Sequence, residues 1–164
     1  MSSFNLVQII PSLDSGGVER GTVDVANFLA EKKIQNFIIT TGGKMITELD
    51  DNFTHVHQLP VASKNFFTYP LIGRKINKFI KANNIDIVHV RSRGPAWMIN
   101  LIAKNNFKTI ATFHNVYGGY SYLKKMYNKG LSKMDHLVAI SEYVKEMIVK
   151  KYNLPPNNIS VINR

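Results

Sequence analysis

The chain has 164 residues, of which 45% are hydrophobic and 20% charged, so it can bury the core of one domain and is not an intrinsically disordered chain. Its net charge of +10 favours an anionic partner, and the absence of cysteine excludes a disulfide framework and a thiolate metal site and indicates a cytoplasmic protein. The N-terminal segment lacks the features of a secretory signal, and no apolar run approaches the roughly 20 residues of a membrane span, so the sequence predicts a soluble or peripheral protein.

Strands and helices are expected to alternate along the chain. Short apolar runs predict strands at residues 4–10, 36–41, 55–59, 86–90, 109–113, 137–140 and 159–162. Helical periodicity predicts helices at residues 18–31, 71–82, 94–104 and 120–133, and a last helix opened by Ser141 as its N-cap.

This alternation defines the expected fold class. The strands are continuously apolar, which is typical of strands buried on both faces of a parallel sheet that helices cover. We therefore predict an α/β fold with a doubly wound, mostly parallel sheet, Rossmann-like and three-layered. Ligands of such folds bind beyond the carboxyl ends of the strands, where the polar residues and glycines of this chain collect.

The turn after the first strand, residues 11–17 (PSLDSGG), is the first candidate site. Gly16 and Gly17 lead directly into a helix, whose first N–H groups and positive dipole end can bind an anion. A plain tight turn that needs glycine for its dihedral angles explains the same residues. The turn is neither a dinucleotide fingerprint nor a Walker loop, because neither spacing is present.

Two further strand ends carry polar side chains. Arg91 and Arg93 follow the fourth strand, where two guanidinium groups suit a phosphate or carboxylate, although they could also be solvated. His114 and Asn115 follow the fifth strand, where the histidine could stabilise a developing charge or simply cap the strand.

Three other histidines and the tryptophan are given structural interpretations. His89 lies inside an apolar strand and is predicted to be a hydrogen-bonded core residue. His55 and His57 share one face of a strand, but no third ligand is near, so a surface strand is favoured over a metal site. Trp97 is assigned to the core, with a sugar platform as the weaker alternative.

Residues 120–133 form the most basic part of the chain. Tyr120, Lys124, Lys125 and Lys129 lie in a predicted helix without an acid, and the segment 65–70 (NFFTYP) adds aromatic residues expected to be exposed. Between Asp51 and Asp135 thirteen basic residues face a single acid. Such a segment is typical of an element that lies on an anionic membrane surface, and an ordinary covering helix is the alternative.

Several function classes lack support in the sequence. No pair of carboxylates, Ser-His-Asp order or cluster of metal ligands stands out, so a self-contained hydrolase is not indicated. No nucleic-acid reading module is present, and we predict no nucleic-acid partner.

Several segments, taken in order, match the motifs of one known family. They are the opening residues 10–13 (IPSL) and 16–20 (GGVER), then 86–93 (DIVHVRSR) with 94–97 (GPAW), 112–115 (TFHN), 135–141 (DHLVAIS) and 158–163 (NISVIN). In this order and spacing they resemble family-4 glycosyltransferases of the GT-B superfamily, and the likeness covers essentially the whole chain.

The resemblance implies a function and a set of site residues. Family members are metal-independent and retaining, use a nucleotide-sugar as co-substrate and need no further cofactor. Gly16 and Gly17 would meet the donor diphosphate, and His114 would lie near the reacting centre. Arg91, Arg93, Asn115 and Ser141 would face a glycan or lipid-linked acceptor. Synthesis of lipopolysaccharide or another surface glycan at the inner face of the cytoplasmic membrane is the expected setting.

The resemblance also implies an incomplete enzyme. The family grips its donor with a second, C-terminal domain, and residues 1–164 are expected to be one N-terminal, acceptor-side domain without it. We therefore expect a C-terminal donor-binding domain or chain as a partner and little transferase activity from these residues alone. The alternative is a non-catalytic domain that binds a phosphosugar or an anionic membrane surface.

Overall fold

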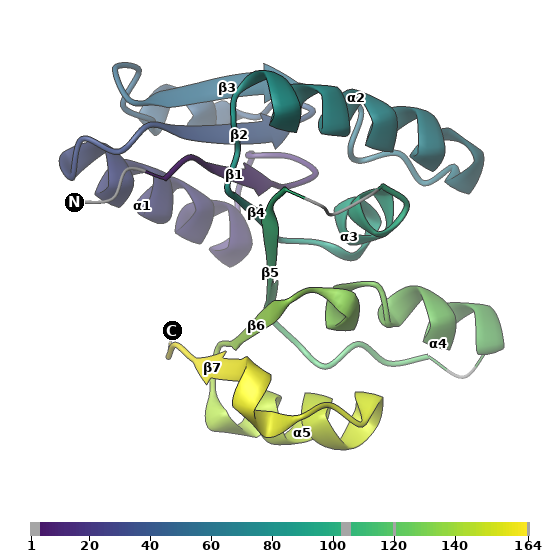
Figure 1. Cartoon of the computed structure of the whole chain (residues 1–164). Coiled ribbons are helices and arrows are strands. Elements are labelled where there is room, and N and C mark those ends of the chain that lie inside the picture. Colours follow the sequence, from purple (N-terminus) through teal and green to yellow (C-terminus); the bar gives the residue numbers. More distant parts are fainter. Residues whose placement is uncertain (1–3, 103–105, 120, 164) are drawn as a thin grey trace.

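The computed structural model describes residues 4–102, 106–119 and 121–163, which form alternating strands and helices (Figure 1). The strands are β1 Leu6–Ile9, β2 Asn36–Thr40, β3 Thr54–Gln58, β4 Ile87–Val90, β5 Lys108–Phe113, β6 His136–Ala139 and β7 Ile159–Val161. The α-helices are α1 Gly17–Glu31, α2 Tyr69–Ala82, α3 Arg93–Asn100, α4 Tyr122–Asn128 and α5 Glu142–Tyr152. Short 3-10 helices are η1 Lys44–Glu48, η2 Phe66–Thr68, η3 Leu131–Lys133 and η4 Pro156–Asn158.

In the described part of the chain the seven strands form one sheet in the order β3-β2-β1-β4-β5-β6-β7. Every neighbouring pair is parallel; Ile9, for example, is in register with Ile39 of β2 and Val90 of β4. The carboxyl ends of all strands therefore lie along one edge of the sheet. The predicted Rossmann-like α/β fold is confirmed, and its sheet is entirely parallel.

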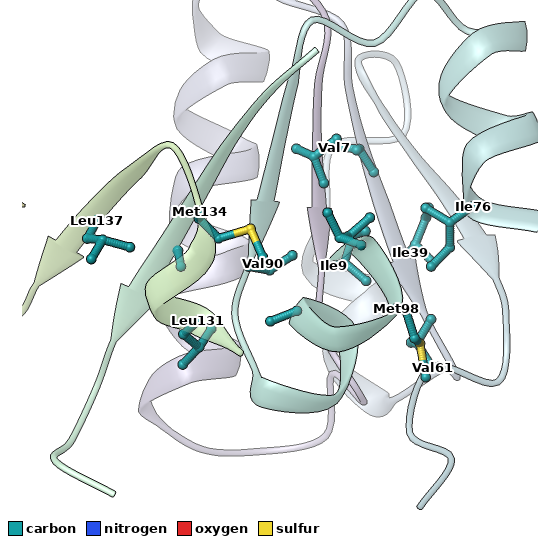
Figure 2. Close-up of a cluster of buried hydrophobic side chains, with 14 of the residues drawn as sticks. Val7, Ile9, Ile39, Val61, Ile76, Val90, Met98, Leu131, Met134 and Leu137 are labelled. Atoms are coloured by element: carbon teal, nitrogen blue, oxygen red, sulfur yellow. The ribbon is translucent and has the colours of Figure 1, made fainter. Parts of the chain in front are cut away.

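Two separate hydrophobic cores flank the sheet. Val7 and Ile9 of β1 belong to the larger core with residues of α2, α3, η3 and α5, part of which is shown in Figure 2. Ile10 and Ile38 belong to the smaller core beneath α1. Figure 1 shows α1 on the side of the sheet opposite to α2 and α3. Helices on both faces explain why the strands are apolar throughout.

The last helix begins as the sequence predicts. The Ser141 side chain caps α5 by accepting a hydrogen bond of 3.2 Å from the N–H of Val144, and Glu142 lies in the first turn. This carboxylate is favourable at the positive end of the helix dipole. The helix ends at Tyr152, and Asn153 after it adopts the left-handed conformation that asparagine tolerates well.

Two predicted helices are shorter than expected. The helix predicted at 94–104 is α3, which ends at Asn100, where the side-chain amide donates to the carbonyl of Gly130. The helix predicted at 120–133 ends at Asn128 and is followed by η3; Tyr120 and residues 103–105 lie outside the described residues. Beyond α4, Gly130 lies against Trp97, where an added Cβ would come within 2.7 Å of the indole nitrogen. None of the helices within the described ranges has the length and apolar character needed to cross a membrane.

Candidate functional site at the carboxyl edge of the sheet

The predicted site residues follow four neighbouring strands. The strands β1, β4, β5 and β6 are adjacent and parallel, so the turns that follow them lie beside one another at one edge. These turns carry Gly16 and Gly17, Arg91 and Arg93, His114 and Asn115, and Ser141, respectively. The topology therefore brings every predicted donor and acceptor residue to the same end of the molecule.

The glycine turn after β1 is held in place by the turn after β2. The N–H of Leu13 donates to the carbonyl of Gly42 at 2.8 Å, and the carbonyl of Leu13 accepts from the N–H of Met45 at 2.8 Å. Between them, Gly43 lies directly against the Leu13 backbone with φ at 141°. Gly42 and Gly43 therefore fix the position of the turn that leads to the candidate anion site.

Gly16 and Gly17 are glycines for different reasons. Gly16 has φ at 133°, and a Cβ there would meet the Glu19 carboxylate at 2.6 Å, so its own backbone requires glycine. Gly17, the first residue of α1, lies outside the left-handed region, and a Cβ would meet nothing within 4 Å. Turn geometry thus accounts for Gly16 but not for Gly17.

Arg91 lies inside the molecule. Only 5% of its surface is exposed, and its guanidinium donates to Oε1 of the fully buried Gln8 and to the carbonyl of Gly21. The Gln8 amide in turn donates to the carbonyl of Thr22 at 2.9 Å. This network connects β4 and β1 to the first turns of α1. Arg91 therefore positions the helix that begins at the glycine turn, while its predicted contact with acceptor stays a prediction.

Arg93 occupies a different environment at the start of α3. Its guanidinium lies over the Tyr117 ring at 4.2 Å and the Tyr127 ring at 5.2 Å, and it donates to the Asn128 side chain at 2.7 Å. These contacts hold the cation beside the turn that follows β5. Arg91 and Arg93 are two residues apart but differ in depth: Arg91 is buried beneath α1, and Arg93 is half-buried.

His114 and Asn115 begin the turn after β5. His114 is half-buried, with its Nε2 atom in the interior, whereas Asn115 is exposed and accepts a 2.7 Å hydrogen bond from the N–H of Val116. Ser141, beyond β6, is half-buried and its hydroxyl serves as the helix cap. The catalytic and binding roles of these three residues stay predictions.

The remaining histidines are structural, as predicted for His89. His89 is buried and its Nε2 lies 2.8 Å from the hydroxyl of Thr112. His55 and His57 are exposed on the edge strand β3, against Phe37 and Phe79, which confirms the predicted surface strand. Within the described residues no three His, Asp or Glu side chains group as a metal site would require.

The environment of His89 makes stability depend on pH. Burial, followed by the nearby charges of Arg91 and His114, lowers its pKa well below 6.5. As pH falls through about 6.5, the unfolded chain binds a proton that the folded chain does not, so the free energy of unfolding decreases. From pH 7.5 to 5.5 we expect His89 to account for a loss of about 1.3 kcal/mol. Urea unfolding at both pH values should show a shallower dependence in His89→Gln, and an unchanged dependence would contradict this assignment.

A groove lies beside Arg93, between the starts of α2 and α3 and the helix α4. Its volume is about 860 Å³, and most of its lining is apolar and aromatic. Trp97, predicted to be core, is half-buried in its wall and donates to the Tyr127 carbonyl at 2.8 Å. Of the aromatic residues expected to be exposed in 65–70, Phe66 and Phe67 are exposed, but Tyr69 is buried, which corrects that expectation. Burial and a hydrogen bond to Tyr127 raise the pKa of Tyr69 to about 12.

Comparison with known proteins identifies the family. The family model described as Glycosyltransferase Family 4 matches residues 15–164. The chain belongs to glycosyltransferase family 4. A glycosyltransferase from Rickettsia africae ESF-5 is 38% identical to it, with a TM-score of 0.83, over 100% of this chain and 44% of that one. None of the curated proteins matches the sequence.

More distant solved structures share the fold. HepE of Anabaena, solved in complex with UDP and glucose, has 12% identity and a TM-score of 0.74 over 97% of this chain and 44% of its own. WaaG, a glycosyltransferase involved in lipopolysaccharide biosynthesis, has 11% identity and a TM-score of 0.69 over 95% and 44%. This family-4 chain therefore spans less than half the length of these structures.

Proposed function

We propose that these residues form the acceptor-side domain of a retaining glycosyltransferase, which transfers a sugar from a nucleotide-sugar to a glycan or lipid-linked acceptor. Membership of the family supports the reaction class. Synthesis of lipopolysaccharide or another surface glycan is the setting we propose, and a donor-binding domain or chain is the partner.

The observation that carries this proposal is Gly17. The open space where its Cβ would stand lies at the amino end of the 15-residue helix α1, and no conformational need explains the glycine. The amino end of a helix attracts phosphate, and a missing Cβ allows the ligand to approach the backbone closely. We propose that Gly16 and Gly17 meet the donor diphosphate there.

The neighbouring turns supply the remaining roles. His114 is proposed to lie near the reacting centre, where an imidazole can donate to a developing charge. Arg93 and Asn115 are proposed to contact the acceptor from the adjacent turns. Arg91 and Ser141 are assigned to the same substrate-binding set, and their hydrogen bonds indicate that they act by holding α1 and α5 in place.

We further propose that α4 lies on the anionic inner face of the cytoplasmic membrane. Tyr122 is 80% exposed and Leu123 is 70% exposed, and Lys124, Lys125 and Lys129 are exposed beside them. Exposed apolar side chains among lysines are typical of an interfacial helix. Tyr120, assigned to the same surface, lies outside the described residues.

Titration with UDP tests the proposed donor site. We expect millimolar binding by the wild-type chain, detected by amide NMR, and at least tenfold weaker binding by Gly17→Ala, because the added methyl group would occupy the ligand's place. Gly118→Ala is the matched control, since a Cβ there also meets nothing within 4 Å. We also expect these residues alone to turn over no nucleotide-sugar.

Equal affinity of the wild-type and Gly17→Ala chains would show that Gly17 does not approach the diphosphate. Turnover of a nucleotide-sugar by residues 1–164 would contradict the proposed need for a donor-binding partner.

A further inference from the structure

The groove beside Arg93 is a separate site from the glycine turn, and its walls are apolar. Side chains from three parts of the chain line it, namely η2 and the start of α2, α3 with the residue after it, and α4 (at the right of Figure 1). The apolar and aromatic lining residues are Phe66, Tyr69, Trp97, Leu101, Leu123, Met126 and Tyr127. A volume of about 860 Å³ is in the range of small-molecule sites rather than of packing defects.

The rim of the groove extends this apolar surface into solvent. Phe66, Leu101 and Leu123 line the groove and are each more than half exposed, and Phe67, which follows Phe66 in the chain, is 95% exposed. Water-exposed apolar side chains gathered around one concave site indicate a place where apolar ligand is bound. None of these four side chains belongs to the buried core, although Phe66 contacts the rings of Tyr69 and Tyr127.

The charge around the groove has one sign. Among its lining residues in the described part of the chain, Lys64, Arg93 and Lys124 are basic and none is acidic. The single acid between residues 52 and 134 is Asp86, which lies before β4 at the opposite end of the sheet and accepts from the N–H of Asn5. A ligand of this groove should therefore combine an apolar part with a negative charge.

Arg93 connects the groove to the proposed transfer site. Its guanidinium lines the groove and also lies 4.2 Å from the ring of Tyr117, in the turn that begins at His114. An anionic group held by Arg93 and Lys124 would thus lie between the apolar groove on one side and the carboxyl edge of the sheet on the other.

We propose that the groove binds the hydrocarbon chain of a lipid phosphate, with the phosphate against Arg93 and Lys124. This inference rests on the proposed function in one respect: it names the acceptor as a lipid-linked sugar phosphate, whose sugar projects towards His114. In this proposal one lipid molecule occupies the groove. This binding is distinct from the proposed attraction of α4 to a membrane surface.

The chain carries its own reporter for this site. Trp97 is the single tryptophan of the sequence and lies in the groove wall, so its fluorescence reports directly on occupancy. We expect monomeric dodecyl phosphate to change the emission of Trp97 saturably. Inorganic phosphate, which lacks the chain, and dodecyl maltoside, which lacks the charge, should bind at least tenfold more weakly.

Matched surface variants locate the binding. Met126→Asp and Lys124→Glu place negative charge on the exposed face of α4 and should each weaken dodecyl phosphate binding at least tenfold. Phe28→Asp and Lys32→Glu alter an exposed apolar side chain and a lysine at the end of α1, where the Lys32 ammonium lies 5.5 Å from the Phe28 ring, and should leave binding unchanged. All four side chains are exposed, so the variants should fold.

Other results would overturn the proposal. Equal responses to inorganic phosphate or to the maltoside would indicate a simple anion site or unspecific adsorption, and unchanged binding by the α4 variants would place the ligand elsewhere. A concentration-dependent dimer in sedimentation that the α4 variants abolish would show that a second copy covers the groove. If dodecyl phosphate does not bind but UDP does, the lipid proposal is wrong and the proposed transferase has another acceptor. If dodecyl phosphate binds but UDP does not, the lipid site stands and the proposed donor site is wrong.

Discussion

Replacing Gly43 by alanine is expected to destabilise the folded chain by about 3 kcal/mol or more. Gly43 has φ at 141°, and its added Cβ would lie 2.3 to 2.5 Å from the backbone carbon, oxygen and nitrogen of Leu13. Leu13 cannot move away from the added Cβ, because its side chain is fully buried and its backbone is hydrogen-bonded to Gly42 and Met45. The clash therefore displaces the turn that leads into α1.

Denaturant unfolding of Gly43→Ala measures this effect. Gly118→Ala is the control for replacing a glycine by itself, since the space around residue 118 is open. If the two variants had the same stability within about 0.5 kcal/mol, the close approach of these two turns would be refuted.

Arg91→Met is expected to lower the free energy of unfolding by about 3 kcal/mol. Methionine fills much of the arginine's volume, but it leaves Oε1 of Gln8 and the carbonyl of Gly21 without this buried donor. Each buried acceptor that loses its hydrogen bond costs about 1–3 kcal/mol. Arg93→Met should cost less, because Arg93 is only half-buried.

A double-mutant cycle with Gln8→Met isolates the interaction. The single Gln8 variant leaves a buried guanidinium without its main acceptor, and the double variant removes both partners. We therefore expect the double variant to be more stable than the sum of the single losses by at least about 1 kcal/mol. Additive losses would show that the buried Arg91–Gln8 pair does not couple.

The sheet could be predicted because burial on both faces leaves a direct trace in the sequence. A strand such as β4, with Val88 and Val90 entering one core and His89 the other face, has to be apolar or internally hydrogen-bonded throughout. Because the strands of the described sheet are all parallel, their polar carboxyl ends lie at one edge. The location of the candidate site was therefore predictable from local patterns.

The depth of individual side chains was not predictable in the same way. Arg91 and Arg93 both follow a strand, but beyond the last ladder residue the period of two no longer determines which side faces solvent. The close approach of Gly130 to Trp97 joins two separate segments, and the groove is formed by residues from three. Such contacts are tertiary and leave no periodic signal. The hints of the groove that the sequence offered were the aromatic residues of segment 65–70 and the run of basic residues without acids.

The UDP titration, read residue by residue from amide NMR spectra, tests most directly whether phosphate is bound where the parallel strands end. We predict that the signals of Gly16, Gly17 and His114 shift together along one saturation curve. Asn84 and Asp86, which line a cavity of about 440 Å³ at the amino end of the sheet, should stay unchanged. Shifts confined to Asn84 and Asp86, or none at the two glycines at saturating UDP, would contradict the account.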